Sequence, residues 1–319
     1  MHVMILGAQG MIGRKLLRAI VAGGLPATAL TLVDVVRPDA PAGFDGPADC
    51  LSVDLSVAGM AEQLVSLRPD VIVHLAAVVS GEAERDFDKG YLTNLDGTRA
   101  LIEAIRLSGD YCPRFLFASS LAVFGAPLPG RIGDEHLLAP LTSYGTQKAI
   151  CELLLEDYAR RGFLDAVTLR LPTICIRPGP PNMAASGFFS NILREPLSGR
   201  PAVLPVDDSV RHWHASPRAA VGFFLHAALM DTGLLGHRRS VTLPGVSATV
   251  GEQIEALRRI AGNDAVALIR RVPEPAIAAI VAGWPGDFDA ARGRALGFRA
   301  EADFEEIIRI FIEDELESV

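Results

Sequence analysis

Three glycines near the start of the chain constrain its fold more than any other feature. They form the motif Gly7-x2-Gly10-x2-Gly13, between an apolar run at residues 2–6 and an amphipathic segment at residues 11–21. In such a motif one glycine makes a tight turn, one lets the backbone approach a pyrophosphate, and one lets a helix pack closely on a strand. The helix start also offers free N–H groups and a positive dipole end to phosphates. The motif therefore predicts a strand–turn–helix unit that binds a dinucleotide.

Short β-branched runs alternate with longer amphipathic segments through the first half of the chain. The expected strands are residues 2–6, 29–34, 51–53, 71–75, 114–118 and 167–171. The expected helices are residues 11–21, 58–67, 86–107 and 143–161. Such alternation predicts an α/β fold with a Rossmann-type, doubly wound parallel sheet and right-handed crossovers.

The character of the sequence changes after Leu171, where prolines and glycines crowd a short region and indicate loops at a boundary. Further on, Thr249 and Glu252 predict a capping box that opens a helix to about Ala261. The last expected helix is residues 304–313. We therefore expect an NAD-binding part at residues 1–175 and 208–246, and a smaller, mostly helical substrate-binding part at residues 176–207 and 247–319.

The composition excludes several classes of protein. A net charge of −8 argues against a nucleic-acid partner, which requires a basic face. The start of the chain has no signal-peptide pattern, and the apolar stretches are too short to span a membrane. Cys50, Cys112, Cys151 and Cys175 are too far apart to form a metal-binding pair. We expect a cytoplasmic protein with reduced thiols, no metal site and no membrane partner.

The acid that ends the second expected strand favours NAD as the dinucleotide. Asp34 follows Gly13 by 21 residues, where a carboxylate can accept both ribose hydroxyls of the adenosine and repels a 2′-phosphate. Arg37 lies nearby and could instead attract that phosphate. The expected cofactor contacts around the turn are Gly7, Gln9, Gly10, Met11, Ile12, Gly13 and Asp34.

The ends of the next two strands extend the expected cofactor site. One pair of residues follows the third strand and faces the adenine, and a run at the end of the fourth strand passes along the cofactor. These residues are Asp54, Leu55, Leu75, Ala76 and Ala77. His74 precedes the run, and we interpret it as a packed strand-end histidine rather than a catalytic one.

A tyrosine and a lysine predict the chemistry. Tyr144 and Lys148 lie four residues apart at the start of an expected helix, which puts them on one face. A phenol with a pKa near 10 is a poor base, but a nearby ammonium and a positive nicotinamide ring both favour phenolate. Ser119 and Ser120 end the fifth strand beside the cofactor. We therefore predict Tyr144 as the base, Lys148 as its partner and Ser120 as the hydroxyl that contacts the substrate oxygen.

Together these motifs resemble the extended short-chain dehydrogenase/reductase family, which includes nucleotide-sugar epimerases and dehydratases. The matching stretches are residues 7–13, 34, 54–55, 74–77, 94–98, 119–125, 144–148 and 170–179. The resemblance implies NAD as cofactor and the same three catalytic roles for Tyr144, Lys148 and Ser120. It also implies cofactor contacts at Asn94 and Pro172. It further implies a homodimer in which the helices at residues 86–107 and 143–161 pack across a two-fold axis.

A closer resemblance runs nearly end to end and is to the family of D-erythronate dehydrogenases. It rests on residues 77–83, 119–127, 158–163, 171–173, 194–196, 215–221 and 280–285. It implies NAD-dependent oxidation of the C2 hydroxyl of a four-carbon sugar acid. Phe124 stands where the wider family has tyrosine, and residues 211–217 replace a segment with which epimerases grip a nucleotide sugar. Both departures favour a small substrate.

A sugar acid carries a carboxylate, which a forked arginine holds best. Arg177 and Arg211 are the two candidates, and each could instead form an ion pair within the protein. The expected substrate contacts are Ser80, Ser120, Tyr144, Thr173, Arg177, Asn182 and Arg211. Two alternatives stay open: a nucleotide-sugar epimerase or dehydratase that keeps NAD bound, and an NAD-binding redox regulator, which the tyrosine–lysine pair disfavours.

Overall fold

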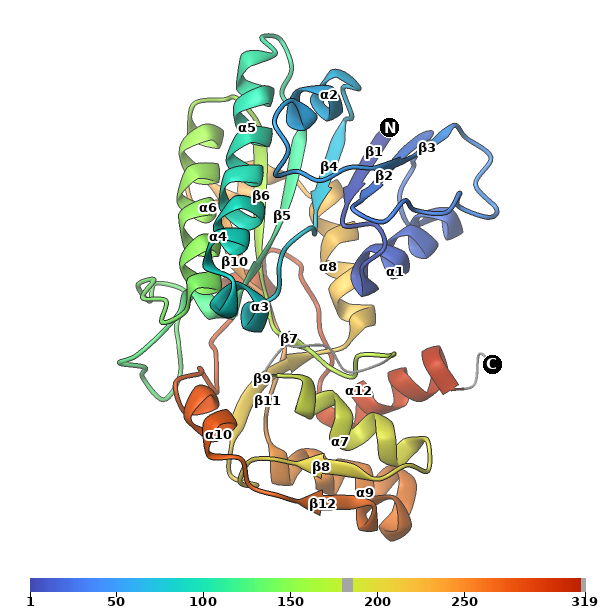
Figure 1. Ribbon diagram of the computed structural model, residues 1–319, viewed down its shortest axis with the longest axis vertical. Helices are drawn as coiled ribbons and strands as arrows, with labels where there is room; N and C mark the ends of the chain where they lie inside the picture. The colour runs from blue at the N-terminus through green and yellow to red at the C-terminus, as the bar shows by residue number, and fades with distance from the viewer. Residues whose placement is uncertain (180–185, 317–319) are drawn as a thin grey trace.

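A seven-stranded, all-parallel sheet forms the centre of the computed structural model, which describes residues 1–179 and 186–316. The strand order is β10-β6-β5-β4-β1-β2-β3 (Figure 1). The strands are β1 (His2–Leu6), β2 (Ala29–Asp34), β3 (Ala48–Ser52), β4 (Val71–His74), β5 (Arg114–Ser120), β6 (Asp165–Leu171) and β10 (Ser240–Thr242). The predicted doubly wound α/β fold is confirmed.

Helices cover both faces of this sheet (Figure 1). One face carries α1 (Met11–Ala19) and α8 (Pro217–Leu229), and the other carries α2 (Met60–Ser66), α5 (Gly97–Leu107) and α6 (Ser143–Arg160). Strand β1 shows the cause, because its side chains alternate between the faces. Val3 and Ile5 join the core under α1, whereas Met4 and Leu6 join the core under α5. A strand buried on both faces reads as one apolar run, as a central parallel strand should.

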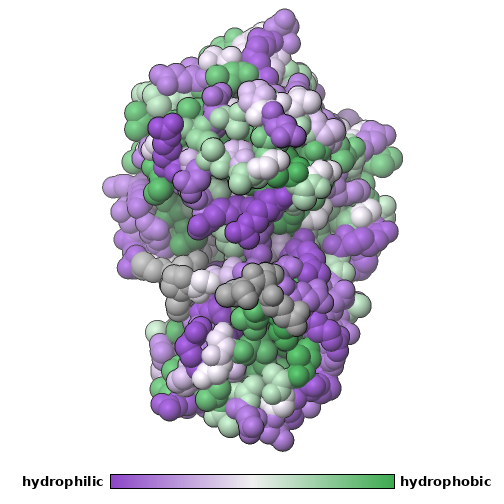
Figure 2. Space-filling model, turned by 90° about the vertical axis from the view of Figure 1, so that its right-hand side faces the viewer, coloured by the Kyte–Doolittle hydropathy of each residue, from purple (hydrophilic) through white to green (hydrophobic). Residues whose placement is uncertain are grey.

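A smaller lobe lies beyond the carboxyl ends of the strands and has its own core (Figures 1 and 2). Its strands are β7 (Thr173–Ile174), β9 (Arg211–Ala215) and β11 (Val246–Thr249) in one sheet, and β8 (Ala202–Leu204) and β12 (Ile269–Arg271) in another. Its helices are α7 (Gly187–Leu197), α9 (Val250–Ala267), α10 (Pro275–Ala282) and α12 (Phe304–Phe311). The capping box at Thr249 and Glu252 is confirmed, with both of its hydrogen bonds formed.

Shorter helical elements complete the fold. They are η1 (Ile20–Gly24), α3 (Ser80–Arg85), α4 (Phe87–Gly90), η2 (Tyr91–Asp96), η3 (Leu121–Val123), η4 (Thr232–Leu235), α11 (Ala291–Ala295) and η5 (Ile312–Leu316). Within the described ranges no helix is long and apolar enough to cross a membrane. The same residues contain no cluster of three or more metal-ligating side chains.

The single helix expected at residues 86–107 is instead three consecutive pieces, α4, η2 and α5. The middle piece is π-helical, and such bulges occur where a helix must place a side chain out of regular register. Here that side chain is Asn94, which is buried and bonded to the backbone of Val78. The helix pattern was therefore right in extent but could not show this interruption.

Helices predominate in the smaller lobe, and short strands that the sequence pattern did not indicate accompany them. Five short strands lie in the smaller lobe, each of two to five residues, too short to give a clear alternating pattern. We keep the division into two parts as a proposal, with one change. Residues 291–300 return to the large sheet, where Phe298 is buried in its core.

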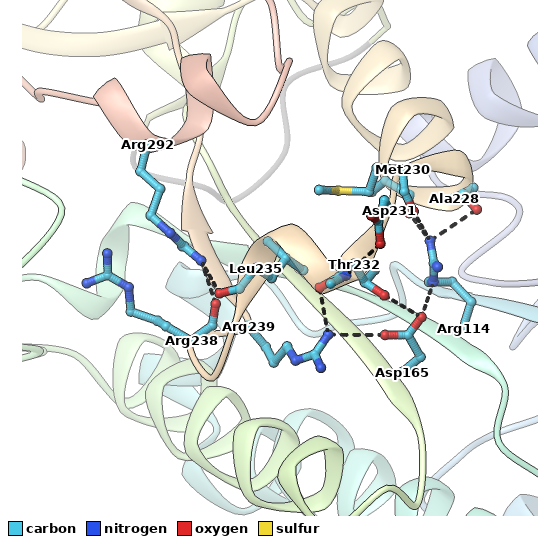
Figure 3. Close-up of polar contacts among 12 residues, drawn as sticks. Arg114, Asp165, Ala228, Met230, Asp231, Thr232, Leu235, Arg238, Arg239 and Arg292 are labelled. Carbon is cyan, nitrogen blue, oxygen red and sulfur yellow. Dashed lines mark hydrogen bonds and ion pairs between the residues drawn. The ribbon is translucent and has the colours of Figure 1, made fainter.

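A polar network fastens the amino ends of β5 and β6 to the connection between α8 and β10 (Figure 3). Arg114 pairs with Asp165 at 2.7 Å and donates to the carbonyl oxygens of Ala228 and Met230, at the C-terminus of α8. A cation is favourable there because the last helix carbonyls lack partners within the helix. Asp165 also accepts from Thr232. The network lies at the strand ends opposite Ser120, so we interpret it as structural.

Candidate active site

The glycine turn between β1 and α1 is closed so tightly that side chains would not fit. A Cβ on Gly13 would lie 2.3 Å from the carbonyl oxygen of Gly7, and a Cβ on Gly7 would lie 2.7 Å from the backbone nitrogen of Ala76. Gly7 also has a φ of +87°, which L side chains rarely adopt. Gly10 caps α1 without any side-chain hydrogen bond. The first N–H groups of α1 are therefore open to an anionic group such as a pyrophosphate.

The carboxylate of Asp34 is held over this turn. Asp34 ends β2, and its Oδ2 accepts the backbone N–H of Gln9 at 2.9 Å. The side chain of Gln9 donates in turn to the backbone oxygen of Arg37. This geometry places a fixed acid beside the helix start, as a ribose-binding carboxylate requires.

Close packing brings Tyr144 and Ser120 together from two elements. Ser120 ends β5, and its hydroxyl accepts the N–H of Ala122 in the following turn. A Cβ on Gly145 would lie 2.1 Å from the carbonyl oxygen of Ala122, so α6 touches that turn through a glycine. Tyr144 and Ser120 are close enough for their hydroxyls to influence each other's ionisation. Lys148 follows one helical turn later, with its ammonium 5.6 Å from the centre of the Tyr144 ring.

Burial sets the ionisation of this pair in the protein without a cofactor. It raises the pKa of Tyr144 to about 12, against the opposite effect of a hydrogen bond with Ser120. It lowers the pKa of Lys148 to about 8, partly offset by Cys151 and Glu152. A buried phenol therefore needs added positive charge before it can serve as a base near neutral pH. The positive nicotinamide ring of an oxidised dinucleotide would supply such a charge.

The candidate substrate residues do not all come together. Ser120 pairs with Leu171 across β5 and β6, and Thr173 lies two residues beyond that partner. Arg177 is largely enclosed and donates to Ser186 at 2.6 Å, and among residues 1–179 and 186–316 no carboxylate pairs with it. Ser80 begins α3, which packs beside α6.

Arg211 lies apart from this group. It begins β9, three residues before the partner of Thr173, and it pairs with Glu252 on the surface at 3.2 Å. Asn182, the remaining candidate, lies outside the described residues. Arg211 is therefore engaged in a surface ion pair, whereas Arg177 has no carboxylate partner within the described ranges.

A comparison with protein families shows the family to which the chain belongs. The model of the NAD dependent epimerase/dehydratase family matches residues 3–216, which include the glycine turn, Ser120, Tyr144 and Lys148. The chain belongs to this family. Its cofactor is NAD.

Two family members are similar over their whole length. A D-erythronate dehydrogenase of Cupriavidus necator is 46% identical over 98% of both chains. A D-erythronate dehydrogenase of Haemophilus influenzae is 42% identical over 98% of this chain and 99% of its own. A crystal structure from Agrobacterium tumefaciens, described as a nucleoside-diphosphate-sugar epimerase, has 62% identity and a TM-score of 0.98, covering 100% of this chain and 95% of that one.

The residues around the turn fit the family's NAD. The glycine turn has no room for side chains, and the first N–H groups of α1 are open to a ligand. Asp34 stands where the ribose would lie. Asp54 lies at the start of the loop between β3 and α2, where bonds from Ser56 lower the pKa of its carboxyl. Leu55 packs on Gly97. The expected run Leu75, Ala76 and Ala77 leaves β4 directly beside Gly7, and Pro172 is buried after β6.

Asn94 has a different place from the one expected of a cofactor contact. Its amide oxygen accepts from the N–H of Val78, and its amide nitrogen donates to the oxygen of Val78 and to Gln147. The side chain is buried and uses its hydrogen bonds within the protein. Asn94 therefore joins the chain after β4 to α6, between Ala77 and Lys148, and shapes the cofactor site through its neighbours.

Sequence reasoning missed a buried ion pair beneath Lys148. Glu152 accepts three hydrogen bonds from Arg170, at 3.1 Å, 3.0 Å and 2.7 Å, and another from the hydroxyl of Ser119. Glu152 and Arg170 are both buried. An available signal was the spacing, because Glu152 follows Lys148 by four residues and so lies on the same helix face.

His74 is packed as expected. Its ring meets the edges of Phe115 and Phe117, and its Nε2 bonds to the hydroxyl of Thr98 at 2.9 Å. Burial lowers its pKa to about 3, and the ammonium of Lys148 adds to that effect. A core histidine whose ring stays neutral does not change its protonation state near neutral pH, so His74 is not suited to act as an acid or a base.

Proposed function

We propose that this protein oxidises the C2 hydroxyl of D-erythronate to the 2-oxo acid, with NAD as the hydride acceptor. The observation that carries the proposal is full-length similarity, at 46% and 42% identity, to D-erythronate dehydrogenases of two bacteria. The arrangement of Tyr144, Lys148 and Ser120 supports the same reaction class. A homodimer and a cytoplasmic location remain predictions of the sequence.

Each catalytic residue has one task in this reaction. Tyr144, as phenolate, accepts the proton of the C2 hydroxyl while the C2 hydrogen leaves as hydride and the C–O single bond becomes a carbonyl. The glycine turn and Asp34 would hold NAD, which would supply the hydride acceptor and a positive ring. Ser120 donates to the substrate oxygen and keeps it oriented. Lys148 would hold the cofactor ribose, and its positive charge favours the phenolate form of Tyr144.

Arg177 is our candidate for the substrate carboxylate. A guanidinium presents two parallel N–H groups, which match the two oxygens of a carboxylate. Arg177 has a buried Nε without a partner in the described part of the chain, so it retains a donor. Thr173 lies four residues earlier, on the segment that continues from the strand beside Ser120. One acid could therefore contact Ser120, Thr173 and Arg177 together.

The test is NADH absorbance after mixing purified protein, NAD and D-erythronate. We expect NADH from the wild type and at least a ~10²-fold lower rate from Tyr144→Phe, because general base catalysis contributes that much. Tyr158→Phe is the matched control, since the Tyr158 hydroxyl bonds to Glu103 on the outer helices. No NADH from the wild type with any four-carbon aldonate would reject the proposal.

A second candidate is a nucleotide-sugar epimerase. The observation in its favour is the 62% identity to the Agrobacterium structure described as such an enzyme. That reaction would regenerate NAD in every cycle and give no net NADH. Interconversion of UDP-glucose and UDP-galactose, with NAD retained through purification, would favour it over the dehydrogenase.

A further inference from the structure

His212 and Thr173 form a hydrogen bond from two neighbouring strands. Strand β7 pairs in parallel with β9, and Thr173 lies opposite His214. His212 precedes His214 by two residues, so both rings lie on the same face of β9. The Nε2 of His212 lies 2.7 Å from the hydroxyl oxygen of Thr173. His212 is buried, with a relative exposure of 5%, whereas Thr173 is partly exposed.

The other side of the ring determines which atom donates. The Nδ1 of His212 lies 2.9 Å from the carbonyl oxygen of Pro285, which can only accept, so Nδ1 carries the proton. Burial lowers the pKa of His212 to about 4, so the ring is neutral and its Nε2 has a free lone pair. The Thr173 hydroxyl must then donate to Nε2. Its remaining lone pairs can only accept a hydrogen bond from another group.

Aromatic rings hold His212 in this orientation. Phe189 stacks on it with an interplanar angle of 7° and a centroid distance of 5.4 Å. Trp284, next to Pro285 in sequence, packs against the ring at 5.2 Å. A ring clamped by stacking and by two hydrogen bonds cannot turn over to offer an N–H to Thr173.

We propose that His212 is a positioning residue that fixes Thr173 as a hydrogen-bond acceptor, and that the site thereby selects acids with a second hydroxyl beyond C2. This inference rests on the proposed function and adds that Thr173 recognises a second hydroxyl of the substrate. A carboxylate facing Thr173 would meet lone pairs instead of a donor. A substrate hydroxyl can donate, so Thr173 binds a hydroxyl and leaves the carboxylate to Arg177.

The test compares D-erythronate with two acids of the same C2 configuration: 2,4-dihydroxybutanoate, which lacks the C3 hydroxyl, and 2,3-dihydroxybutanoate, which lacks the C4 hydroxyl. We expect the wild type to lose about 10- to 100-fold in kcat/KM with one of them, because the Thr173 acceptor, covered by the bound acid, is left unpaired. Thr173→Val and His212→Phe should lower kcat/KM for D-erythronate by a similar factor. Neither should lower kcat/KM for the disfavoured acid further, because that acid makes no hydrogen bond to Thr173.

Conservative variants separate positioning from general damage. His212→Gln can place an amide oxygen near Nε2 and should recover most of the lost preference. His226→Phe is the matched control, since His226 bonds to Leu296 on the outer side of the large sheet. An equal loss with all three acids in His212→Phe, or no loss at all, would overturn the inference while leaving the dehydrogenase intact. A wild type silent toward all three would instead reject the function itself.

A second readout does not depend on activity. Nitrogen-15 NMR of the histidine rings, assigned with His212→Gln, should show His212 protonated at Nδ1 and bare at Nε2 at neutral pH. A proton on Nε2 would make Thr173 the acceptor within the pair and would overturn the inference whatever the substrate.

Discussion

The ammonium of Lys148 lies 4.5 Å from the centre of the Phe117 ring and has no carboxylate of its own among the described residues. The nearest acid in the helix, Glu152, is taken up by Arg170 and Ser119. Lys148 is therefore a buried cation whose desolvation cost is not offset by a carboxylate. The ring face of Phe117 offsets part of that cost through a cation–π contact.

Lys148→Met should stabilise the protein while abolishing its activity. Burial lowers the pKa of Lys148 from 10.5 to about 8. This shift corresponds to a loss of at most ~3 kcal/mol in the free energy of unfolding, and removing the charge should recover part of that loss. Because a lowered lysine pKa opposes folding below about pH 8, the gain in Tm should be present at pH 7. It should fade as the pH rises toward 10.5.

Thermal unfolding at pH 7 and pH 10 measures this effect, with Lys89→Met as control. Lys89 is an exposed lysine paired with Glu82, and its replacement should leave the free energy of unfolding almost unchanged. A lower Tm for Lys148→Met at pH 7 would contradict the prediction.

Three buried histidines should make the fold sensitive to mild acid. Burial lowers the pKa of His74 to about 3 and of His212 to about 4, and it lowers that of His214 well below 6.5. The unfolded chain binds protons near pH 6.5 and the folded chain does not. The stability is thus complete above that pH and is lost as the pH falls below it. Each histidine should remove about 1.4 kcal/mol per pH unit below 6.5.

Urea unfolding at pH 7.5 and pH 5.5 tests this expectation. The free energy of unfolding should fall by about 4 kcal/mol between the two conditions. In His212→Gln, which has one buried histidine fewer, about a third of that fall should disappear. An unchanged fall in the variant would show that other groups bind the protons.

The parts of the site that could be read from the sequence are those fixed by local geometry. Gly7, Gly10 and Gly13 lie within one turn, and Tyr144 and Lys148 lie within one helix, so spacing alone determines how they meet. Thr173 and His212 are 39 residues apart, and their contact exists only because β7 pairs with β9. A sequence pattern holds no information on that pairing.

Arg177 and Arg211 illustrate the same limit. Both were sensible carboxylate ligands by residue type, and only the fold separates them. The capping box of α9 places Glu252 beside Arg211, and that acid pairs with the arginine on the surface. The sequence pattern could not predict the π-helical piece η2 either. Asn94 in this piece bonds to Val78, which lies in another segment of the chain.

Gly13→Ala should abolish NAD binding. The added Cβ would lie 2.3 Å from a carbonyl oxygen and 2.9 Å from two further backbone atoms, so the turn or the helix must move. Overpacking of this kind costs about 1–3 kcal/mol, and the displaced N–H groups would no longer face the pyrophosphate. NAD should raise the Tm of the wild type and leave that of the variant unchanged. Gly130→Ala is the control, because nothing lies within 4 Å of its added Cβ.

Arg177→Lys should raise the KM for D-erythronate about 10- to 100-fold with little change in the KM for NAD. Lysine keeps the charge but loses the fork that matches two carboxylate oxygens. Arg211→Lys is the matched control, and it should alter neither constant, because Arg211 forms an exposed pair with Glu252 worth less than ~1 kcal/mol. Steady-state kinetics with each substrate varied in turn gives both constants. If Arg211→Lys raised the KM for the acid and Arg177→Lys did not, the carboxylate would have to be held by Arg211, at the other end of β9 from the partner of Thr173.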